Sequence, residues 1–357
     1  MKRLHTDLVD PDDISRPNGQ FLGFPYSLEE SQVVFFPVPW DVTTSYGGGT
    51  VNGAQAIIDA SVQLEPTDYH VTEAWKIGHY TIPITEEIKA KNKQMRSIAK
   101  KVITYQEEGN SYQDSTIQSE LKIVNDACEE LNHWVYNQTK ALLHQNKLIG
   151  LIGGDHSVPY GYIKALAEHY GEYGILQIDA HADLRKAYEG FTYSHASIMH
   201  NVLKLPEISH LIQVGLRDFS QGEIEQADQD QRVTWFTDWE IKDKAYQGYL
   251  WSNQCQEIIN CLPEQVYISF DIDGLSPHFC PHTGTPVPGG LDFNQVIYLI
   301  IALVKAGKRV IGFDLCEVSP NLNNLEDEWD GNVGARVAYK LANLMFASQD
   351  YSLTLSY

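Results

Sequence analysis

Short apolar runs recur along the chain at intervals typical of buried β-strands. The first is Val33–Val38, and later ones lie at 147–152, 173–178, 210–215, 265–270 and 309–315. Runs of this length, rich in Val, Ile and Leu, are typical of strands that are covered on both faces. The pattern therefore predicts a sheet buried between other elements.

Helical spacing dominates between these runs. From about Ile84 to Gln145 the chain is charged, and within its second half apolar residues recur every three or four positions, at Leu121, Val124, Cys128, Leu131 and Val135. Helices are also predicted at 158–169, 293–306 and 334–347. Alternating strands and helices predict βαβ units and a mainly parallel sheet, which is the α/β fold class.

The N-terminal part of the chain has a different composition. Residues 1–31 are polar and rich in proline and glycine, so we expect an arm without much regular structure that could serve in assembly. Residues 32–357 show no break in composition and no internal repeat, which predicts a single domain. The turn at 39–53 contains Gly47-Gly48-Gly49 without a following Gly-Lys-Ser/Thr, so it is not a phosphate loop. A tight turn that needs positive φ is favoured over direct substrate contact.

Charge and hydropathy exclude several classes of protein. The 357 residues carry a formal charge of -21, which opposes binding to nucleic acid or to an anionic membrane and tolerates a cationic substrate. The longest clean apolar run, 296–304, is far shorter than the roughly 20 residues of a membrane span. The first residues lack the apolar core of a secretory signal. We therefore expect a cytoplasmic protein.

Three of the predicted strands end in oxygen or imidazole donors. The strand at 147–152 leads through two glycines to Asp155 and His156, and the strand at 265–270 leads to Asp271 and Asp273. The strand at 173–178 leads to Asp-Ala-His-Ala-Asp, residues 179–183. Parallel α/β sheets collect their chemistry at the carboxyl ends of strands, so these donors are expected to converge in one crevice.

The donor types indicate a site for two metal ions. Alternating positions of a strand face the same side, and the alanines between Asp179, His181 and Asp183 leave room for the three donors to crowd together. By itself, a strand-end histidine such as His156 is more often structural. Together, oxygen-rich ligands with some imidazole suit Mn²⁺ best, although Ni²⁺, Co²⁺ or Fe²⁺ can also occupy such sites. The predicted ligands are His156, Asp179, His181, Asp183, Asp271 and Asp273.

These motifs resemble the ureohydrolase family of arginase, agmatinase, formiminoglutamase, guanidinobutyrase and the guanidine hydrolases. The matching segments are Gly-Gly-Asp-His-Ser at 153, Asp-Ala-His-Ala-Asp at 179, Ser-Phe-Asp-Ile-Asp at 269, Gly-Thr-Pro-Val-Pro-Gly-Gly at 284 and Glu-Val-Ser-Pro at 317. The segments 37–46 and 193–197 resemble the agmatinase-like subgroup. The resemblance implies a three-layer α-β-α sandwich, a catalytic domain over 32–357 and a homo-oligomer, a trimer or hexamer.

The resemblance also implies a role for each site residue. Asp179 and Asp271 would bridge two ions, with His156 and Asp183 completing the first site and His181 and Asp273 the second. Asp273 would also receive a proton from the nucleophile. Glu317 would bind guanidinium N–H groups, and His195 would carry protons. The plain alternatives are a surface acid for Glu317 and a packed histidine for His195. His282 replaces a glycine of many relatives at the pocket border, which makes it a candidate substrate-binding residue.

The implied reaction is hydrolysis of a guanidino compound to urea and an amine or ammonia. The loop after Asp183 lacks the pattern with which arginases hold an α-amino acid, so arginine is a poor candidate. An agmatine-like substrate and free guanidine are nearly equally favoured, and guanidinobutyrase or formiminoglutamase activity is an alternative. The rivals are a one-zinc deacetylase-type amidohydrolase and a metal-bound regulatory scaffold. The aromatic residues Trp40, Tyr46 and Trp75 could stack on a planar cation, although such residues are more often core.

Overall fold

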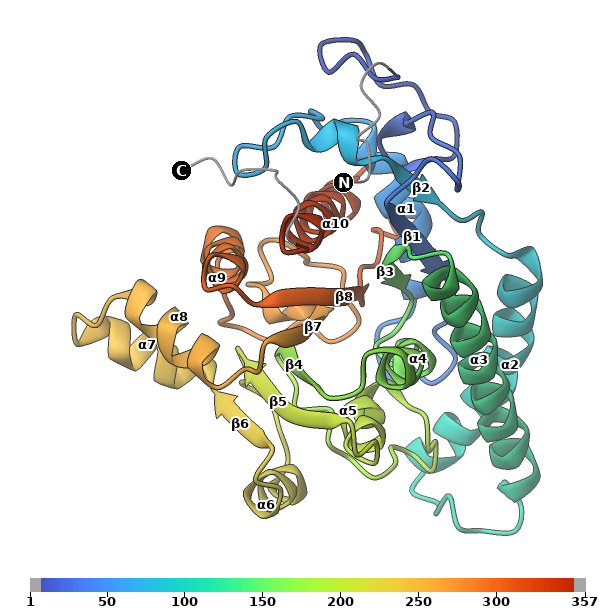
Figure 1. The fold of residues 1–357 in the computed structure, drawn as a ribbon. Helices are drawn as coiled ribbons and strands as arrows, with labels where there is room; N and C mark the ends of the chain where they lie inside the picture. Colours follow the sequence, from blue (N-terminus) through green and yellow to red (C-terminus); the bar gives the residue numbers. More distant parts are fainter. Residues whose placement is uncertain (1–7, 350–357) are drawn as a thin grey trace.

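A computed structural model describes residues 8–349, which form one eight-stranded sheet in which all neighbouring strands are parallel (Figure 1). The strand order is β2-β1-β3-β8-β7-β4-β5-β6, so the three strands that precede the candidate ligands, β3, β7 and β4, lie near the centre. The strands are β1 (Val33–Val38), β2 (His79–Thr81), β3 (Leu148–Gly153), β4 (Tyr173–Ile178), β5 (Ile208–Val214), β6 (Val233–Phe236), β7 (Gln265–Asp271) and β8 (Arg309–Cys316).

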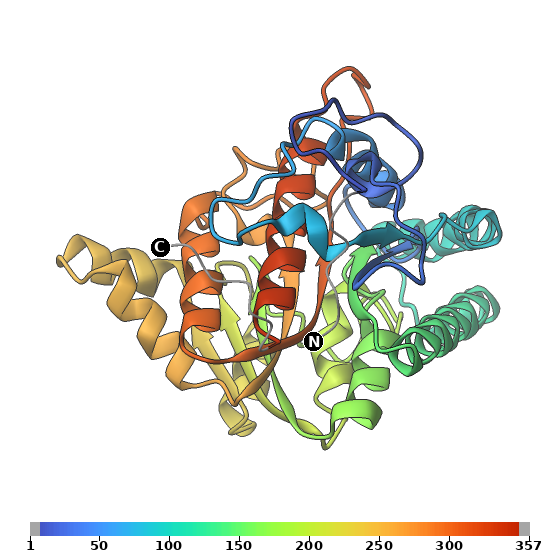
Figure 2. The same cartoon turned by 45° about the horizontal axis from the view of Figure 1, so that its top comes forward.

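Helices cover both faces of this sheet (Figures 1 and 2). The pleat of β1 divides its side chains between two cores, because Val33 and Phe35 join one apolar cluster and Val34 and Phe36 join the other. The first cluster includes residues of α1, α8, α9 and α10, and the second includes residues of α2 to α5. The chain is therefore a three-layer α-β-α sandwich, as expected.

The helices differ widely in length. The longest, α2 and α3, lie side by side on one face, and α9 and α10 are neighbours on the other (Figure 2). The helices are α1 (Gly53–Ser61), α2 (Glu86–Glu107), α3 (Gln118–His144), α4 (Tyr160–Tyr170), α5 (Ile198–Val202), α6 (Gln221–Gln229), α7 (Asp238–Tyr246), α8 (Trp251–Asn260), α9 (Phe293–Lys305) and α10 (Trp329–Ala347).

The predicted strands and helices are present, with ends that shift by a few residues. The apolar stripe predicted for α3 is buried along its whole length. The sequence pattern missed β2, β6, α1 and the short helices α5 to α8. β2 has only three residues, and every side chain of β6 is partly exposed, so neither strand carries a continuous apolar run.

Residues 8–31 contain only one turn of 3-10 helix, at Phe21–Gly23, in agreement with the expected lack of regular structure. Phe21, Leu22, Phe24 and Tyr26 are nevertheless buried in the core that contains α1 and α10. This part of the predicted arm is therefore packed against the domain. A role in assembly stays a prediction, and residues 1–7 lie outside the described residues.

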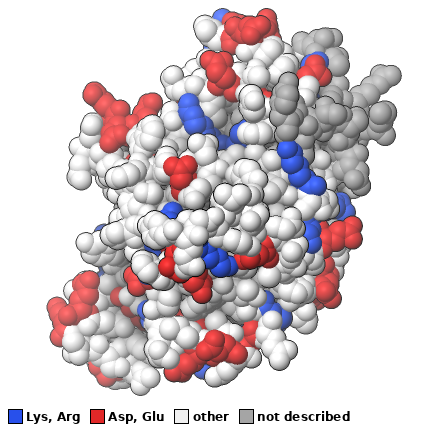
Figure 3. All heavy atoms as spheres, turned by 90° about the vertical axis from the view of Figure 1, so that its left-hand side faces the viewer, with Lys and Arg blue, Asp and Glu red and all other residues white. Residues whose placement is uncertain are grey.

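Charged side chains on the face shown in Figure 3 form separate acidic and basic groups on a largely uncharged surface, so the charge of -21 is not gathered into one continuous patch there. No helix within residues 8–349 combines the length and apolar character needed to cross a bilayer. The cytoplasmic location stays a prediction.

His79 on β2 links the stability of this fold to pH. Its ring is 1% exposed and stacks against Phe35, with centroids 5.9 Å apart and planes inclined by 14°. Burial disfavours the charged ring and lowers the pKa of His79 from 6.5 to about 3. Below pH 6.5 the unfolded chain therefore binds a proton that the folded chain does not, and folding is destabilised as the pH falls toward 3.

The free energy of unfolding of the parent should fall as the pH is lowered from 7.5 to 5.5. We expect this fall to be about 1.4 kcal/mol smaller in His79→Phe. Urea unfolding of parent and variant at both pH values measures this difference. His133→Asn, at an exposed histidine of α3, is the control and should keep the parent's pH dependence. An equal loss in parent and His79→Phe would contradict the assignment.

Candidate metal centre

The six predicted ligands come together at the carboxyl edge of the sheet. His156 follows β3, residues 179–183 follow β4, Asp271 ends β7, and Asp273 lies in the 3-10 turn Ile272–Gly274. Their polar atoms form two groups that share Asp179. All are buried except His181, whose side chain is 24% exposed and lines a cavity.

The first group surrounds one nitrogen of His156. Its Nδ1 lies 3.1 Å from Asp179 Oδ2, 3.0 Å from Asp183 Oδ2 and 3.3 Å from Asp271 Oδ2. Nδ1 is buried and makes no hydrogen bond of good geometry within the described residues. Burial alone would lower the pKa of His156, but these three carboxylates, together with that of Asp314, raise it well above its ordinary value. A positive charge is thus strongly favoured at this point.

The second group surrounds His181. Its Nδ1 lies 3.0 Å from Asp273 Oδ2 and 3.7 Å from Asp179 Oδ1. Asp179 therefore presents one oxygen to each group, and its role as a bridging ligand stays a prediction. Asp271 places its Oδ2 in the first group, and its Oδ1 accepts the backbone N–H of Asp273 at 2.9 Å. Against the effect of burial, Asp273 and Asp179 raise the pKa of His181 to about 12.

Buried amide groups hold the carboxylates in place. The backbone N–H of Ala180 donates to Asp273 Oδ1 at 3.0 Å, and the N–H of His181 donates to Asp179 Oδ1 at 2.7 Å. The side chain of Gln177 donates to Asp179 Oδ2 at 2.7 Å and accepts from Gln213 at 2.6 Å. These bonds orient the oxygens before any ion binds.

This set of donors fits two divalent cations. Each group consists of carboxylate oxygens around an imidazole nitrogen, and two positive ions would offset the mutual repulsion of four buried aspartates. Oxygen ligands with a minority of imidazole favour Mn²⁺ or a similar ion over a thiolate-seeking one. The residues present are therefore chemically suited to divalent ions, and the binuclear assignment stays a prediction.

A cavity of about 180 Å³ opens beside both groups. His156, His181, Asp183 and Asp271 reach it, and so do the two predicted catalytic residues His195 and Glu317. The sequence pattern did not single out several other lining residues, since they lie in loops and short helices outside the strands. These are Ser45, Arg185, Tyr188, Ala196, Asp218, Phe219, Glu223 and Thr285.

Burial shifts the pKa values of Glu317 and His195 in opposite directions, and in both residues it disfavours the charged form. Glu317 Oε1 accepts the backbone N–H of His156 at 2.9 Å, whereas Oε2 is buried without a hydrogen-bond partner among the described residues. Burial, with the nearby Asp155, raises the pKa of Glu317 well above its ordinary value. His195 is fully buried, and burial lowers its pKa to about 3, which leaves the imidazole neutral near pH 7.

His282 does not line the cavity. Its Nδ1 lies 2.7 Å from Asp330 Oδ2, and its backbone N–H donates to the other oxygen of Asp330 at 3.0 Å. Asp330 at the start of α10 fixes the imidazole, and the contact of His282 with substrate stays a prediction. The sequence did not reveal the pairing of His282 with Asp330, because the two residues are 48 positions apart.

The aromatic and glycine candidates also lie outside the cavity lining. Trp40 is fully buried, Tyr46 is 83% exposed, and Trp75 packs against the core. In the triple glycine only Gly49 has positive φ, at 125°. Gly47 instead meets Gly284, whose carbonyl oxygen would lie 2.5 Å from an added Cβ atom. The segment thus acts as a tight turn, as favoured from the sequence.

Comparison with known proteins agrees with this geometry. The family model described as "Arginase family" matches residues 31–346. The chain belongs to the arginase family. It is 31% identical over 293 residues to an N(1)-aminopropylagmatine ureohydrolase of Thermus thermophilus, covering 82% of this chain and 84% of that one. It is 27% identical over 294 residues to an agmatinase of Bacillus cereus, covering 82% and 86%.

Solved structures of arginase-family proteins share the fold. An agmatine ureohydrolase of Thermoplasma volcanium superposes with a TM-score of 0.68 at 25% identity, covering 94% of this chain and 95% of that one. An arginase of Bacillus subtilis superposes with a TM-score of 0.63 at 19% identity, covering 88% and 98%, which shows the fold alone. This arginase-family chain is thus a ureohydrolase of agmatinase-like type.

We expect Asp179→Asn to bind fewer than one divalent ion per chain when the parent binds two. The reason is that Asp179 offers an oxygen to both groups. Metal analysis after Mn²⁺ loading and desalting measures the stoichiometry, and circular dichroism checks the fold. Asp218→Asn is the control, because Asp218 lines the cavity outside both ligand groups. Retention of two ions by Asp179→Asn would contradict the ligand assignment.

Proposed function

We propose that the chain hydrolyses a guanidino compound to urea and an amine or ammonia at a centre of two divalent ions. The ligands are His156, Asp179, His181, Asp183, Asp271 and Asp273. The observation that carries the proposal is the buried Oε2 of Glu317, which faces the same cavity as both imidazoles and has no hydrogen-bond partner among residues 8–349. A guanidinium N–H supplies the charge-assisted partner that this oxygen lacks.

The reaction adds water to the guanidinium carbon and breaks one carbon–nitrogen bond. Two divalent ions would lower the pKa of water enough for it to attack near neutral pH. Asp273 accepts a proton from the attacking water, since its Oδ2 lies 3.0 Å from the imidazole of His181, which lines the cavity. Neutral His195 lines the cavity and exchanges protons with the departing nitrogen, which leaves as an amine.

The leading substrate is an agmatine-like compound, a guanidino group joined to a cationic tail. The named relatives act on agmatine derivatives, and the exposed carboxylate of Asp218 at the cavity can pair with an ammonium tail. Free guanidine is the second candidate, favoured by the small cavity of about 180 Å³. Arg185 also lines the cavity and would suit a carboxylate tail, so guanidinobutyrate and formiminoglutamate remain alternatives to test.

Mn²⁺ is the proposed native ion, and Ni²⁺ is the alternative, because the ligands are mainly carboxylates. A homo-oligomer, trimeric or hexameric, is proposed from the family resemblance. Light scattering on the purified protein determines the number of subunits.

We expect urea release from agmatine or from guanidine, with Glu317→Gln reducing kcat/KM by roughly 100-fold or more, because the neutral amide loses the charge that binds guanidinium. The assay uses agmatine, guanidine, guanidinobutyrate and formiminoglutamate, each with Mn²⁺ and with Ni²⁺. Glu326→Gln, an exposed acid outside the cavity, is the matched control. Absence of urea from every substrate, with two ions bound, would refute the proposal.

Substitution of Asp218 distinguishes the two leading candidate substrates. We expect Asp218→Asn to raise KM for agmatine by about tenfold, the loss of roughly 1.4 kcal/mol of charge pairing, while KM for guanidine stays unchanged. Steady-state kinetics on both substrates measures the effect. Equal changes in KM for both substrates would show that Asp218 does not bind the ammonium tail of agmatine.

A further inference from the structure

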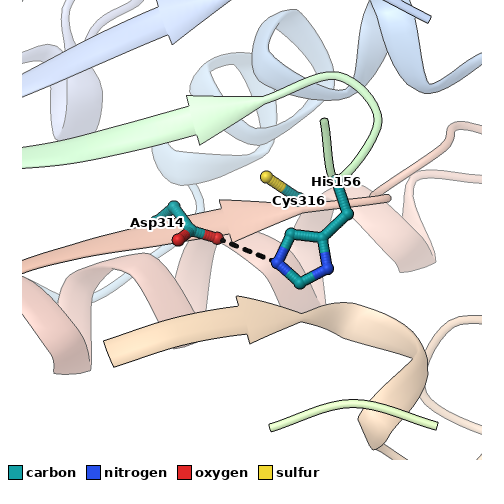
Figure 4. A group of neighbouring side chains, drawn as sticks. All are labelled: His156, Asp314 and Cys316. Carbon is teal, nitrogen blue, oxygen red and sulfur yellow. Dashed lines mark ion pairs between the residues drawn. The ribbon is translucent and has the colours of Figure 1, made fainter. Parts of the chain in front are cut away.

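The side of His156 that faces away from the carboxylate cluster is as fully buried as the cluster itself. Its Nε2 lies 2.8 Å from Ser269 Oγ and 3.5 Å from Asp314 Oδ1. Figure 4 shows Asp314 and Cys316 on β8, with the carboxylate of Asp314 directed at the imidazole. Asp314, Ser269 and Cys316 are each 0% exposed.

The register of the sheet creates this arrangement. Ser269 on β7 is the direct partner of Asp314 on β8, so both side chains emerge side by side toward the ring. The hydroxyl of Tyr267 donates to Asp314 Oδ2 at 2.6 Å. Asp314 Oδ1 is buried and makes no hydrogen bond within the described residues. One oxygen of the carboxylate is thus fixed and the other faces the imidazole.

A carboxylate and a hydroxyl beside Nε2 favour the tautomer that carries its proton there. The lone pair of the neutral ring is then on Nδ1, which is the atom that faces Asp179, Asp183 and Asp271. A buried Asp in the middle of an apolar strand would otherwise be costly, because an unpaired charge loses its hydration. The contact with the imidazole of His156 offsets this cost.

His156, Asp314 and Cys316 lie close enough to hold an ion themselves. That use conflicts with the first group, since one imidazole would then bind ions through both nitrogens and need to lose both of its protons. Asp314 therefore acts better through Nε2–H than as a ligand.

We propose that Asp314 is a positioning residue which, with Ser269, fixes the tautomer and orientation of His156 for binding the first metal ion. The inference rests on the proposed two-metal function. It also predicts an asymmetry, since no partner of His181 Nε2 is found among residues 8–349, and the His181 side chain is 24% exposed. Substitution of Asp314 should therefore weaken the binding of one of the two ions much more than the binding of the other.

The test is titration of the metal-free, full-length protein with Mn²⁺ alone. Binding is monitored by calorimetry and by the paramagnetic resonance signal of free Mn²⁺. Asp314→Asn keeps the size of the side chain. We expect it to lower the affinity for one ion by roughly 10- to 100-fold and the affinity for the other by less than about threefold. The pattern should match that of Asp183→Asn, whose carboxylate contacts only the His156 group. Cys316→Ser, in the same cluster, is the control and should bind both ions as the parent does.

Wild-type affinity for both ions in folded Asp314→Asn would overturn the inference, and so would equal weakening of both, which indicates a general structural defect. If Asp314→Asn does not fold, Ser269→Ala decides in the same way: selective weakening of one ion supports the inference, and unchanged or equally weakened binding overturns it. A parent protein that fails to bind two ions refutes the proposed function instead. The two failures are therefore distinguishable.

Discussion

Burial of four aspartates in one cluster is the constraint on which the site depends. The ligand atoms of His156, Asp179 and Asp183 lie within 4.8 Å of one another, and so do those of Asp179, His181 and Asp273. Two like charges at that distance repel by about 3.5 kcal/mol at an effective dielectric constant of 20, and burial adds the cost of lost hydration. Positive charge on His156 and His181, or on metal ions, offsets this repulsion. Without it, burial and the neighbouring aspartates raise the pKa values of Asp183 and Asp271 and favour their neutral forms.

The sheet supplies the rigidity that this cluster requires. Parallel strands β3, β7 and β4 bring three distant stretches of chain to one edge, and the turns after them donate backbone N–H groups to the aspartates. Asp183 and Glu317 both adopt left-handed backbone conformations, with φ of 55° and 62°. Such conformations cost about 1 kcal/mol or more for residues with a side chain, so surrounding packing must hold them in place.

Polar residues inside the apolar strands form a second layer behind the ligands. Gln177 on β4 bonds to Asp179, and Ser269 and Asp314 on β7 and β8 face His156. Since a buried polar group needs a partner, each such residue within a strand is explained by the ligand it orients. The cavity side, by contrast, is formed by loops, and the residues that would distinguish substrates, Arg185 and Asp218, lie there.

The sequence alone determined the strands of the inner sheet, the α3 stripe and all six candidate ligands, because these depend on local periodicity and on motifs within a few residues. Tertiary structure decided what depends on contacts between distant segments. It packed Phe21 into the core and paired His282 with Asp330 outside the cavity. It also set the register that places Asp314 beside Ser269. No local pattern contains that information, since the partner of each residue lies on another strand or loop.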